Sequence, residues 1–318
     1  MQEKVGDSVA EVRSLTKMEV AIIKTLLYFD IFNYPLKSEE IFYFAGAKAL
    51  HVGEIHGALE HLVGENLIYC FGEFFSTQNK IENVERRRSG NAVAESIMPK
   101  AYQRALLIGK FPFVRSVMAS GSLSKGYMDS KSDLDFFIVT APGRLYIARM
   151  LLVLYKRIFL HNSSKEFCVN YFISSDQLEI EEKNQFTATE LATVIPMFGQ
   201  HLYKKMLETN TWLYNFFPNY LPRPSTPLQE TSGLLKTLAE KLMNGALGQR
   251  LDEWCMRVTQ KRWEKLYRKQ YSDPDFDVAF KSKRHASKTH PRHYHKHVTN
   301  LMDEKWKWFA ERHNCEMA

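Results

Sequence analysis

The sequence predicts an α+β protein in which a mixed sheet is flanked by an N-terminal domain of helices and a hairpin and by a C-terminal helical region. Three observations lead to this fold class. Apolar residues recur at helical spacing in the first part of the chain, strands and helices alternate in the middle, and the last part is helical and basic. We therefore expect domains at residues 1–79, 80–216 and 217–318.

Composition excludes several classes of protein. Hydrophobic residues make up 45% of the 318 positions and charged residues 25%, the balance of a globular protein with a sizeable core. The most apolar helix candidate, 145–160, is short and carries Arg149, Lys156 and Arg157, so we expect no membrane span. The four cysteines are far apart and the N-terminus has no secretory signal, so we expect reduced thiols in a cytoplasmic protein.

The N-terminal part is expected to fold as three helices and a hairpin. Helical spacing covers 18–29 and 52–64, and Ser38 begins a short helix between them. Apolar runs at 67–71 and 74–76 flank a Gly-Glu turn and predict two paired strands. This order of elements resembles a winged-helix domain.

The charge of this part argues against DNA binding. Winged helices often place their third helix in the major groove. Here residues 18–79 contain 3 Lys or Arg against 8 Asp or Glu, and the expected third helix, 52–64, has no Lys or Arg. Because phosphate contacts supply much of the affinity for DNA, we expect this domain to contact proteins or to regulate its own chain.

The middle part begins with a helical stretch, 83–110, that we expect to break near Pro99. Its hydrophobic pattern then predicts strand, strand, helix and strand at 114–119, 134–139, 145–160 and 167–173.

A polar motif connects the first two of these strands. The first ends in Ser120-Gly121-Ser122, and after ten further residues Asp133-Leu134-Asp135 begins the second. Residues two apart on a strand point the same way, so both carboxylates are expected on one side and Leu134 on the other. Such a pair favours a divalent cation, and Mg²⁺ completes its shell with water and phosphate oxygens. The glycine lets the backbone approach a phosphate closely.

This stretch resembles the signature of the nucleotidyltransferase superfamily, of the DNA polymerase β type. Gly121, Ser122, Asp133 and Asp135 match a Gly-Ser turn followed by Asp-hydrophobic-Asp. The resemblance implies Mg²⁺ or Mn²⁺ at the two aspartates, and a nucleoside monophosphate moved from a nucleoside triphosphate to an acceptor. It implies nucleotide binding by the turn, Gly121 and Ser122. It implies the same role for Lys125, Gly126 and Ser132, which match common additions to the signature.

The sequence departs from this family at one position. Members usually carry another acid in the middle of a neighbouring strand, where this chain has Asn170. An amide can lend an oxygen to a metal or orient a metal-bound water, but it cannot act as a base. Glu166 is expected on the same face and could take the acid's place. The sequence therefore leaves two functions open: an active transferase, or a catalytically weakened nucleotide-binding regulator with a winged-helix interaction module.

The C-terminal part is basic and follows a proline-rich crossing. Residues 228–318 contain 18 Lys or Arg against 12 Asp or Glu, with an interruption of the helical pattern at 272–274. The run 281–297 has six Lys or Arg, five His and no acid; its irregular His spacing argues against zinc. Two interpretations stay open for this run: a solvated tail, or a segment that holds triphosphate or an RNA acceptor. The acceptor (RNA, protein or small molecule) and the base of the triphosphate (ATP, CTP, GTP or UTP) are not identified.

Overall fold

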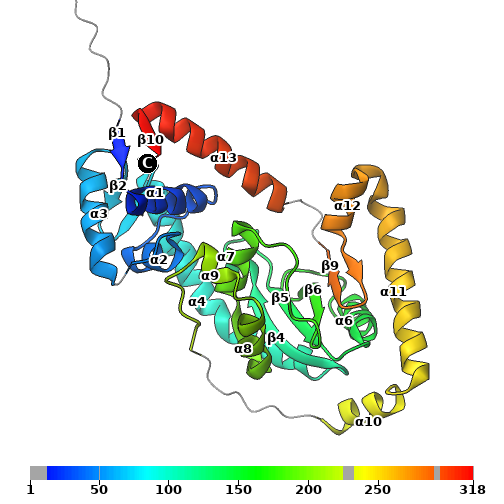
Figure 1. Ribbon diagram of the computed structural model, residues 1–318. Helices are drawn as coiled ribbons and strands as arrows, with labels where there is room; N and C mark the ends of the chain where they lie inside the picture. The colour runs from blue at the N-terminus through cyan, green and yellow to red at the C-terminus, as the bar shows by residue number, and fades with distance from the viewer. Residues whose placement is uncertain (1–12, 50, 225–232, 290–293, 318) are drawn as a thin grey trace, which may run out of the picture. The chain divides into compact units, whose positions relative to one another are not determined.

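The computed structural model describes residues 13–49, 51–224, 233–289 and 294–317 (Figure 1). The chain forms two compact units. Unit 1 contains the chain up to Arg87 together with Tyr214–Leu221 and the C-terminal part from Lys296, and unit 2 contains Arg88–Leu213 and Pro222–His295. Helices and a sheet with both parallel and antiparallel pairs confirm the predicted mixed α and β content.

Unit 1 contains the predicted helices and hairpin. A capping box begins the first helix, because the Glu19 N–H donates to Thr16 Oγ1 (3.2 Å) and the Thr16 N–H donates to the Glu19 carboxylate (2.8 Å). A backbone bridge between Leu36 and Phe75 joins a third short segment to the hairpin. The elements are β1 (Arg13–Leu15), α1 (Lys17–Asp30), α2 (Ser38–Phe44), α3 (Val52–Gly64), β2 (Tyr69–Phe71), β3 (Phe74–Ser76), α9 (Leu213–Phe216), α13 (Tyr294–His313) and β10 (Cys315–Met317).

Helix α4 (Ile81–Gly109) is continuous, so the break expected near Pro99 is wrong. The proline ring removes one amide donor, which leaves the carbonyl of Glu95, four residues earlier, without its helical partner. Pro99 and Glu95 are both exposed. Water can therefore take the place of the missing N–H, and the helix continues. The boundary between the two units lies within this helix, after Arg87.

Unit 2 is built on a six-stranded sheet in the order β7-β4-β5-β6-β9-β8. Strands β5 and β6 are parallel and are connected through α6, while the other neighbours are antiparallel. The predicted strands and helix are confirmed to within a residue or two. The elements are β4 (Val114–Ser120), α5 (Gly121–Ser124), β5 (Asp135–Thr140), α6 (Leu145–Phe159), β6 (Cys168–Ser174), α7 (Gln185–Thr193), β7 (Ile195–Phe198), α8 (Gln200–Thr209), α10 (Leu234–Leu242), α11 (Ala246–Tyr267), η1 (Arg268–Gln270), α12 (Asp273–Ala279), β8 (Ser282–Lys283) and β9 (Ala286–Lys288).

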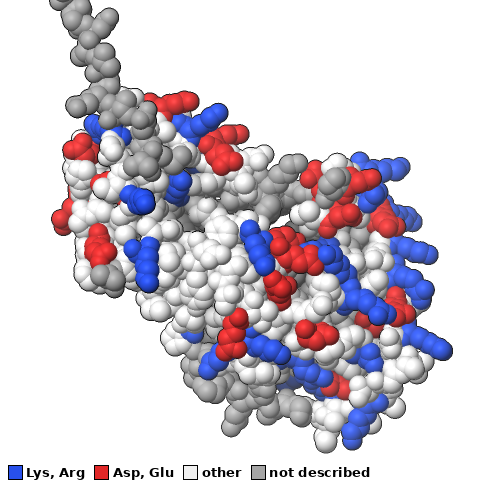
Figure 2. Space-filling view, viewed as in Figure 1, with Lys and Arg blue, Asp and Glu red and all other residues white. Residues whose placement is uncertain are grey.

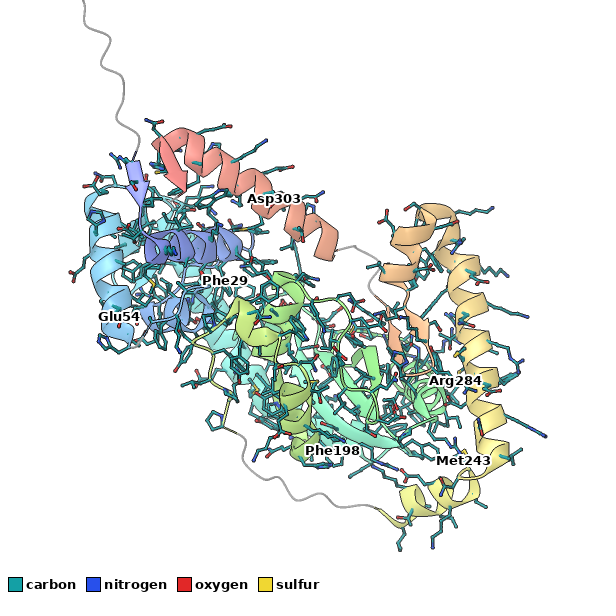
Figure 3. All side chains as sticks on the ribbon, in the orientation of Figure 1. Phe29, Glu54, Phe198, Met243, Arg284 and Asp303 are labelled. Atoms are coloured by element: carbon teal, nitrogen blue, oxygen red, sulfur yellow. The ribbon has the colours of Figure 1, made fainter. Side chains whose placement is uncertain are left out.

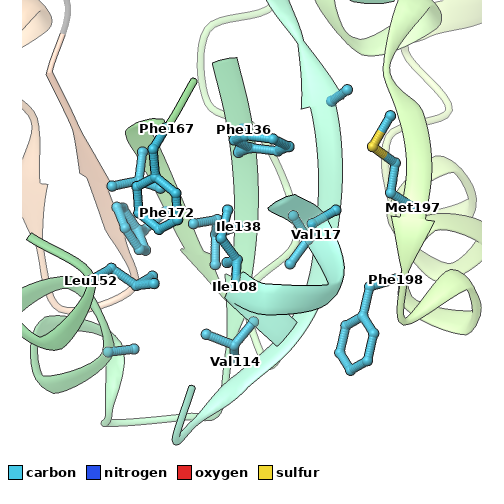
Figure 4. Close-up of a cluster of buried hydrophobic side chains, with 14 of the residues drawn as sticks. Ile108, Val114, Val117, Phe136, Ile138, Leu152, Phe167, Phe172, Met197 and Phe198 are labelled. Atoms are coloured by element: carbon cyan, nitrogen blue, oxygen red, sulfur yellow. The ribbon is translucent and has the colours of Figure 1, made fainter. Parts of the chain in front are cut away.

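One face of this sheet carries the main core (Figure 4). Phe136 and Ile138 of β5 and Phe172 of β6 are fully buried there, against Ile108 of α4 and Leu152 of α6. Alternation along β5 sends Asp135 and Phe137 to the opposite face. We call that opposite face the site face. The core thus fixes the register of β5 and, with it, the direction of the Asp135 side chain.

The two compact units divide residues 217–318 between them. Within unit 2, Asp252 of α11 accepts a hydrogen bond from the Ile147 N–H at the start of α6 (2.8 Å). Arg144 donates to the carbonyls of Met243 (2.9 Å) and Asn244 (2.8 Å), where α10 ends (Figure 3). These polar contacts tie α10 and α11 to the sheet domain.

Two further expectations concern the basic charge of the C-terminal part and the interruption of its helical pattern. Lys and Arg side chains gather over α11 (Figure 2), where the exposed ones are Arg250, Arg257, Lys261, Arg262 and Lys265. The interruption expected at 272–274 is confirmed, since Ser272 is the N-cap of α12 and a proline lies in its first turn.

Across the described ranges, every helix is too short or too polar to span a membrane.

Candidate functional site

The predicted Gly-Ser turn lies directly against the first aspartate of β5. Strand β4 ends at Ser120, which pairs in register with Asp135, and α5 begins at the next residue. Gly121 has a φ of +63°, and a Cβ placed on it would lie 2.4 Å from Asp135 Oδ2. This position therefore needs glycine both for its left-handed backbone and for the space it leaves to the carboxylate.

The two aspartates lie at the start of β5: Asp133 comes just before the strand and Asp135 is its first residue. Leu134 between them is 2% exposed and belongs to the core, while Asp133 and Asp135 are partly exposed. Burial, together with the negative charges of Asp133 and Glu190, raises the pKa of Asp135 to about 6. Burial and these two charges therefore both disfavour the ionised Asp135 carboxylate, a cost that a bound cation would offset.

Asn170 reaches the aspartates because β6 contains a bulge. Phe136 pairs with Val169 but Phe137 pairs with Tyr171, so Asn170 is the extra residue between them. Its side-chain N–H donates to Asp135 Oδ1 (3.2 Å). The bulge places both Asn170 and Tyr171 on the site face.

The bulge also interrupts the alternation of side chains between the two faces of β6. Simple alternation puts Cys168, Asn170 and Phe172 on one face, but Phe172 is buried in the core on the opposite face. Glu166, the other candidate for the missing acid, lies near α4 instead. It accepts hydrogen bonds from Lys100 and from Arg104 (2.6 Å), and these bonds hold the pKa of its carboxyl below the usual value. Glu166 therefore does not take the place of a third carboxylate here.

The remaining predicted residues lie in the loop between β4 and β5. Lys125 Nζ pairs with Glu190 of α7 (2.7 Å) and donates to the Gly121 carbonyl (3.1 Å), next to the aspartates. The Ser122 carbonyl accepts the Lys125 N–H (3.1 Å), which closes the turn. Gly126 has a φ of +69°. Its carbonyl accepts a hydrogen bond from the Asn91 side chain of α4.

Ser132 is the predicted residue that the structure does not aim at the carboxylates. Its hydroxyl donates to Asp129 Oδ1 (2.8 Å) and accepts the Asp129 N–H (3.1 Å). Ser132 thus shapes the loop that delivers Asp133. The structure brings Gly121, Lys125, Asp133, Asp135 and Asn170 together and leaves Ser132 with a supporting contact.

Sequence reasoning did not single out Glu190, whose charge acts on Asp135, or Lys288, which lies on the same face of the sheet. Glu190 lies on α7, and its charge acts on Asp135 as well as on Lys125. Lys288 lies on β9 opposite Tyr171, and its ammonium nitrogen is 5.5 Å from the centroid of the Tyr171 ring. A glutamate in a polar helix carries no recognisable pattern. Lys288 belongs to the basic run at 281–297, which was the only signal for it.

Residues 281–289 of that basic run form a strand pair in the sheet, so the solvated-tail interpretation is wrong for them. Lys281 pairs with Glu182 (2.7 Å) and Lys283 pairs with Glu181 (2.7 Å). Arg284 pairs with Glu253 of α11 (Figure 3). These ion pairs neutralise three of the six basic residues of the run and fix the hairpin in place. Residues 290–293 lie outside the described residues.

The donor set fits a hard divalent cation with few protein ligands. Over the described ranges, no three His, Cys, Asp or Glu residues come together as a metal-binding group. Asp133 and Asp135 are adjacent carboxylates, and Mg²⁺ or Mn²⁺ bound by two carboxylates completes its shell with water and phosphate oxygens. No family model, curated protein or solved structure matches this chain.

Proposed function

We propose that unit 2 is a nucleotidyltransferase of the DNA polymerase β type, which uses Mg²⁺ or Mn²⁺ to move a nucleoside monophosphate from a nucleoside triphosphate to an acceptor. The contact between Gly121 and Asp135 carries this proposal. It places backbone that can approach a phosphate beside a pair of carboxylates that can hold a cation. Triphosphate transfer needs these two features next to each other.

Each residue of the site has a separate task in this proposal. Asp133 and Asp135 hold the cation, which neutralises charge on the triphosphate when it is bound. The turn at Gly121 and Ser122 offers backbone N–H groups to the phosphates, and Lys125 adds a positive charge. Asn170 donates to Asp135 Oδ1 and so keeps that carboxylate oriented. As an amide, it takes no proton from the acceptor.

Thermal unfolding with ATP, CTP, GTP and UTP, each with and without Mg²⁺, tests this proposal without knowledge of the acceptor. A ligand at about a hundred times its Kd adds roughly 2.7 kcal/mol of stability. We expect a Mg²⁺-dependent rise in Tm with at least one triphosphate and its loss in Asp133→Ala. Glu39→Ala, an exposed acid of unit 1, serves as the charge control. If no triphosphate raises the Tm, the proposal is rejected.

A second candidate function is nucleotide sensing without efficient transfer. The observation that favours it is the amide of Asn170 at the position where the family carries an acid. The variant Asn170→Asp distinguishes the two functions in an assay of pyrophosphate release. A weakened site gains activity when the acid is restored, whereas an active transferase adapted to the amide loses activity.

We further propose that unit 1 is a winged-helix module that contacts a protein. The order α1-α2-α3-β2-β3 and the bridge from Leu36 to Phe75 support this assignment. Helix α3 has no Lys or Arg and carries Glu54 and Glu60, so DNA phosphates would be repelled from it. A pull-down of the full chain against DNA and against protein extracts tests this; retention on DNA at physiological salt contradicts it.

A further inference from the structure

We propose that Lys288 binds the triphosphate and that its ammonium group supplies the positive charge that a second divalent cation brings to two-metal sites. The site then binds one cation. The inference rests on the proposed function of unit 2. It assigns a phosphate-binding role to the C-terminal hairpin, and it explains why a site with Asn170 in place of an acid can still bind triphosphate.

The register of the sheet puts Lys288 on the site face. Tyr171 pairs with Phe137 on one side and with Lys288 on the other, and paired residues in neighbouring strands point to the same face. The Phe137 and Tyr171 rings are 4.7 Å apart, and the Lys288 nitrogen lies 5.5 Å from the Tyr171 ring. Phe137 follows Asp135 by two residues on β5. The carboxylate and the ammonium therefore share one face, separated by β6.

Asn170 itself fixes the strand that carries this lysine. The carbonyl of Asn170 accepts the Thr289 N–H (2.9 Å), while its side chain donates to Asp135 (3.2 Å). One residue thus connects the aspartate to the end of β9. Neighbouring strands are about 4.8 Å apart, so the span from β5 to β9 is on the order of 10 Å. A triphosphate chain and a lysine side chain can bridge that span.

The charge environment separates Lys288 from the other lysines of the hairpin. Lys281 and Lys283 each have a carboxylate oxygen within 3.0 Å. Among the described residues, Lys288 has no carboxylate within ion-pair distance, although Glu182 and Glu190 act on it electrostatically. Burial lowers the pKa of Lys288, against the opposing effect of these two glutamates. An anionic ligand would offset the cost of holding this partly buried ammonium.

The net charge of the site matches one divalent cation. Asp133 and Asp135 contribute two negative charges, and Lys125 and Glu190 offset each other at 2.7 Å. Asn170 adds no charge, and Lys288 adds one positive charge. A single Mg²⁺ then leaves the site positive toward the triphosphate. A second one would lack the carboxylate that a two-metal site needs to hold it.

The test is isothermal titration of the intact chain with each of ATP, CTP, GTP and UTP in the presence of Mg²⁺, in wild type and in variants. We expect Lys288→Met to bind the triphosphate about tenfold to a hundredfold more weakly, because it loses a charge-assisted contact to phosphate. Lys288→Arg should bind within a few fold of wild type. Lys283→Met, in the same hairpin but paired with Glu181, should bind as wild type does. Equal affinity of Lys288→Met and wild type overturns the inference.

Metal stoichiometry tests the same inference in wild type alone, independently of how the variants fold. Electron paramagnetic resonance of Mn²⁺, titrated into protein saturated with the triphosphate, counts the bound ions. One protein-bound ion per chain is expected, and two overturn the inference. A failure of the proposed function is recognised by a different result. In that case wild type and Asp133→Ala show the same titration, whatever the result for the Lys288 variants.

Discussion

Replacing Gly121 with alanine tests the link between the Gly-Ser turn and the carboxylate. The residue has a φ of +63°, and the added Cβ would lie 2.4 Å from Asp135 Oδ2 and 3.1 Å from its Cγ. Real Cβ atoms essentially never come as close as 2.4 Å to another atom, so the carboxylate or the turn has to move. The substitution therefore combines backbone strain with a displaced Asp135 carboxylate.

The two effects are separated by a matched control. Gly143 has a φ of +61°, and a Cβ there would meet no atom within 4 Å. Gly143→Ala should therefore cost only the left-handed conformation, about 1–2 kcal/mol. Gly121→Ala adds the clash, which by analogy with overpacked sites costs about 1–3 kcal/mol more. The gain from restricting the unfolded chain is the same in both variants and cancels in the comparison.

Urea denaturation followed by circular dichroism measures the difference in unfolding free energy, and titration with the Mg²⁺–triphosphate measures the effect on the site. We expect Gly121→Ala to be the less stable variant and to bind the nucleotide about tenfold more weakly, while Gly143→Ala keeps wild-type affinity. If the two variants match in both stability and affinity, the contact between the turn and Asp135 does not shape the site, and the reasoning is refuted.

Three further predictions concern single charged groups. Burial raises the pKa of Asp135 to about 6, so the folded state binds this proton more tightly than the unfolded chain, and the stability due to this group falls as pH rises from about 4 to about 6. In urea denaturation at pH 7.5, Asp135→Asn should therefore be more stable than wild type, by at most about 3 kcal/mol. At pH 4 it should be no more stable than wild type. A stability advantage that does not change with pH contradicts this prediction. Glu190→Gln should release Lys125 and raise triphosphate affinity by about threefold to tenfold in calorimetry, and an unchanged affinity argues against a phosphate role for that lysine. Asp30→Ala should destabilise unit 1 by about 3 kcal/mol, because the buried carboxylate accepts from the Ser76 hydroxyl and the Thr77 N–H; a loss below about 0.5 kcal/mol, as for a surface substitution, rules this out.

Hydrophobic periodicity predicted the elements that fold against the core. Strand β5 and helix α6 bury side chains at the spacing typical of a strand and of a helix, so the limits of both elements follow from the local sequence. The direction of Asp135 was predictable for the same reason, since the next residue of the strand, Phe136, is buried in the core. The break expected at Pro99 does not occur, because Pro99 and Glu95 lie on the exposed side of α4, where the loss of one hydrogen bond is tolerated.

The rest of the site depends on contacts between residues far apart in the sequence. Strand β9 is short and polar, and it exists because β6 offers it an edge with free amides and carbonyls. Lys288 reaches the site face only through that pairing, and Glu190 comes near Asp135 only through the packing of α7. The bulge at Asn170 likewise appears only when β6 is aligned with β5. No periodic pattern within the local sequence encodes such contacts.

Anomalous diffraction from crystals grown with Mn²⁺ and a non-hydrolysable triphosphate tests the central claim most directly. Mn²⁺ takes the same oxygen ligands as Mg²⁺ and scatters anomalously. The account predicts one peak within coordination distance of the Asp133 and Asp135 carboxylates, with phosphate oxygens completing its shell. Triphosphate bound elsewhere, or a peak that neither aspartate touches, would contradict it.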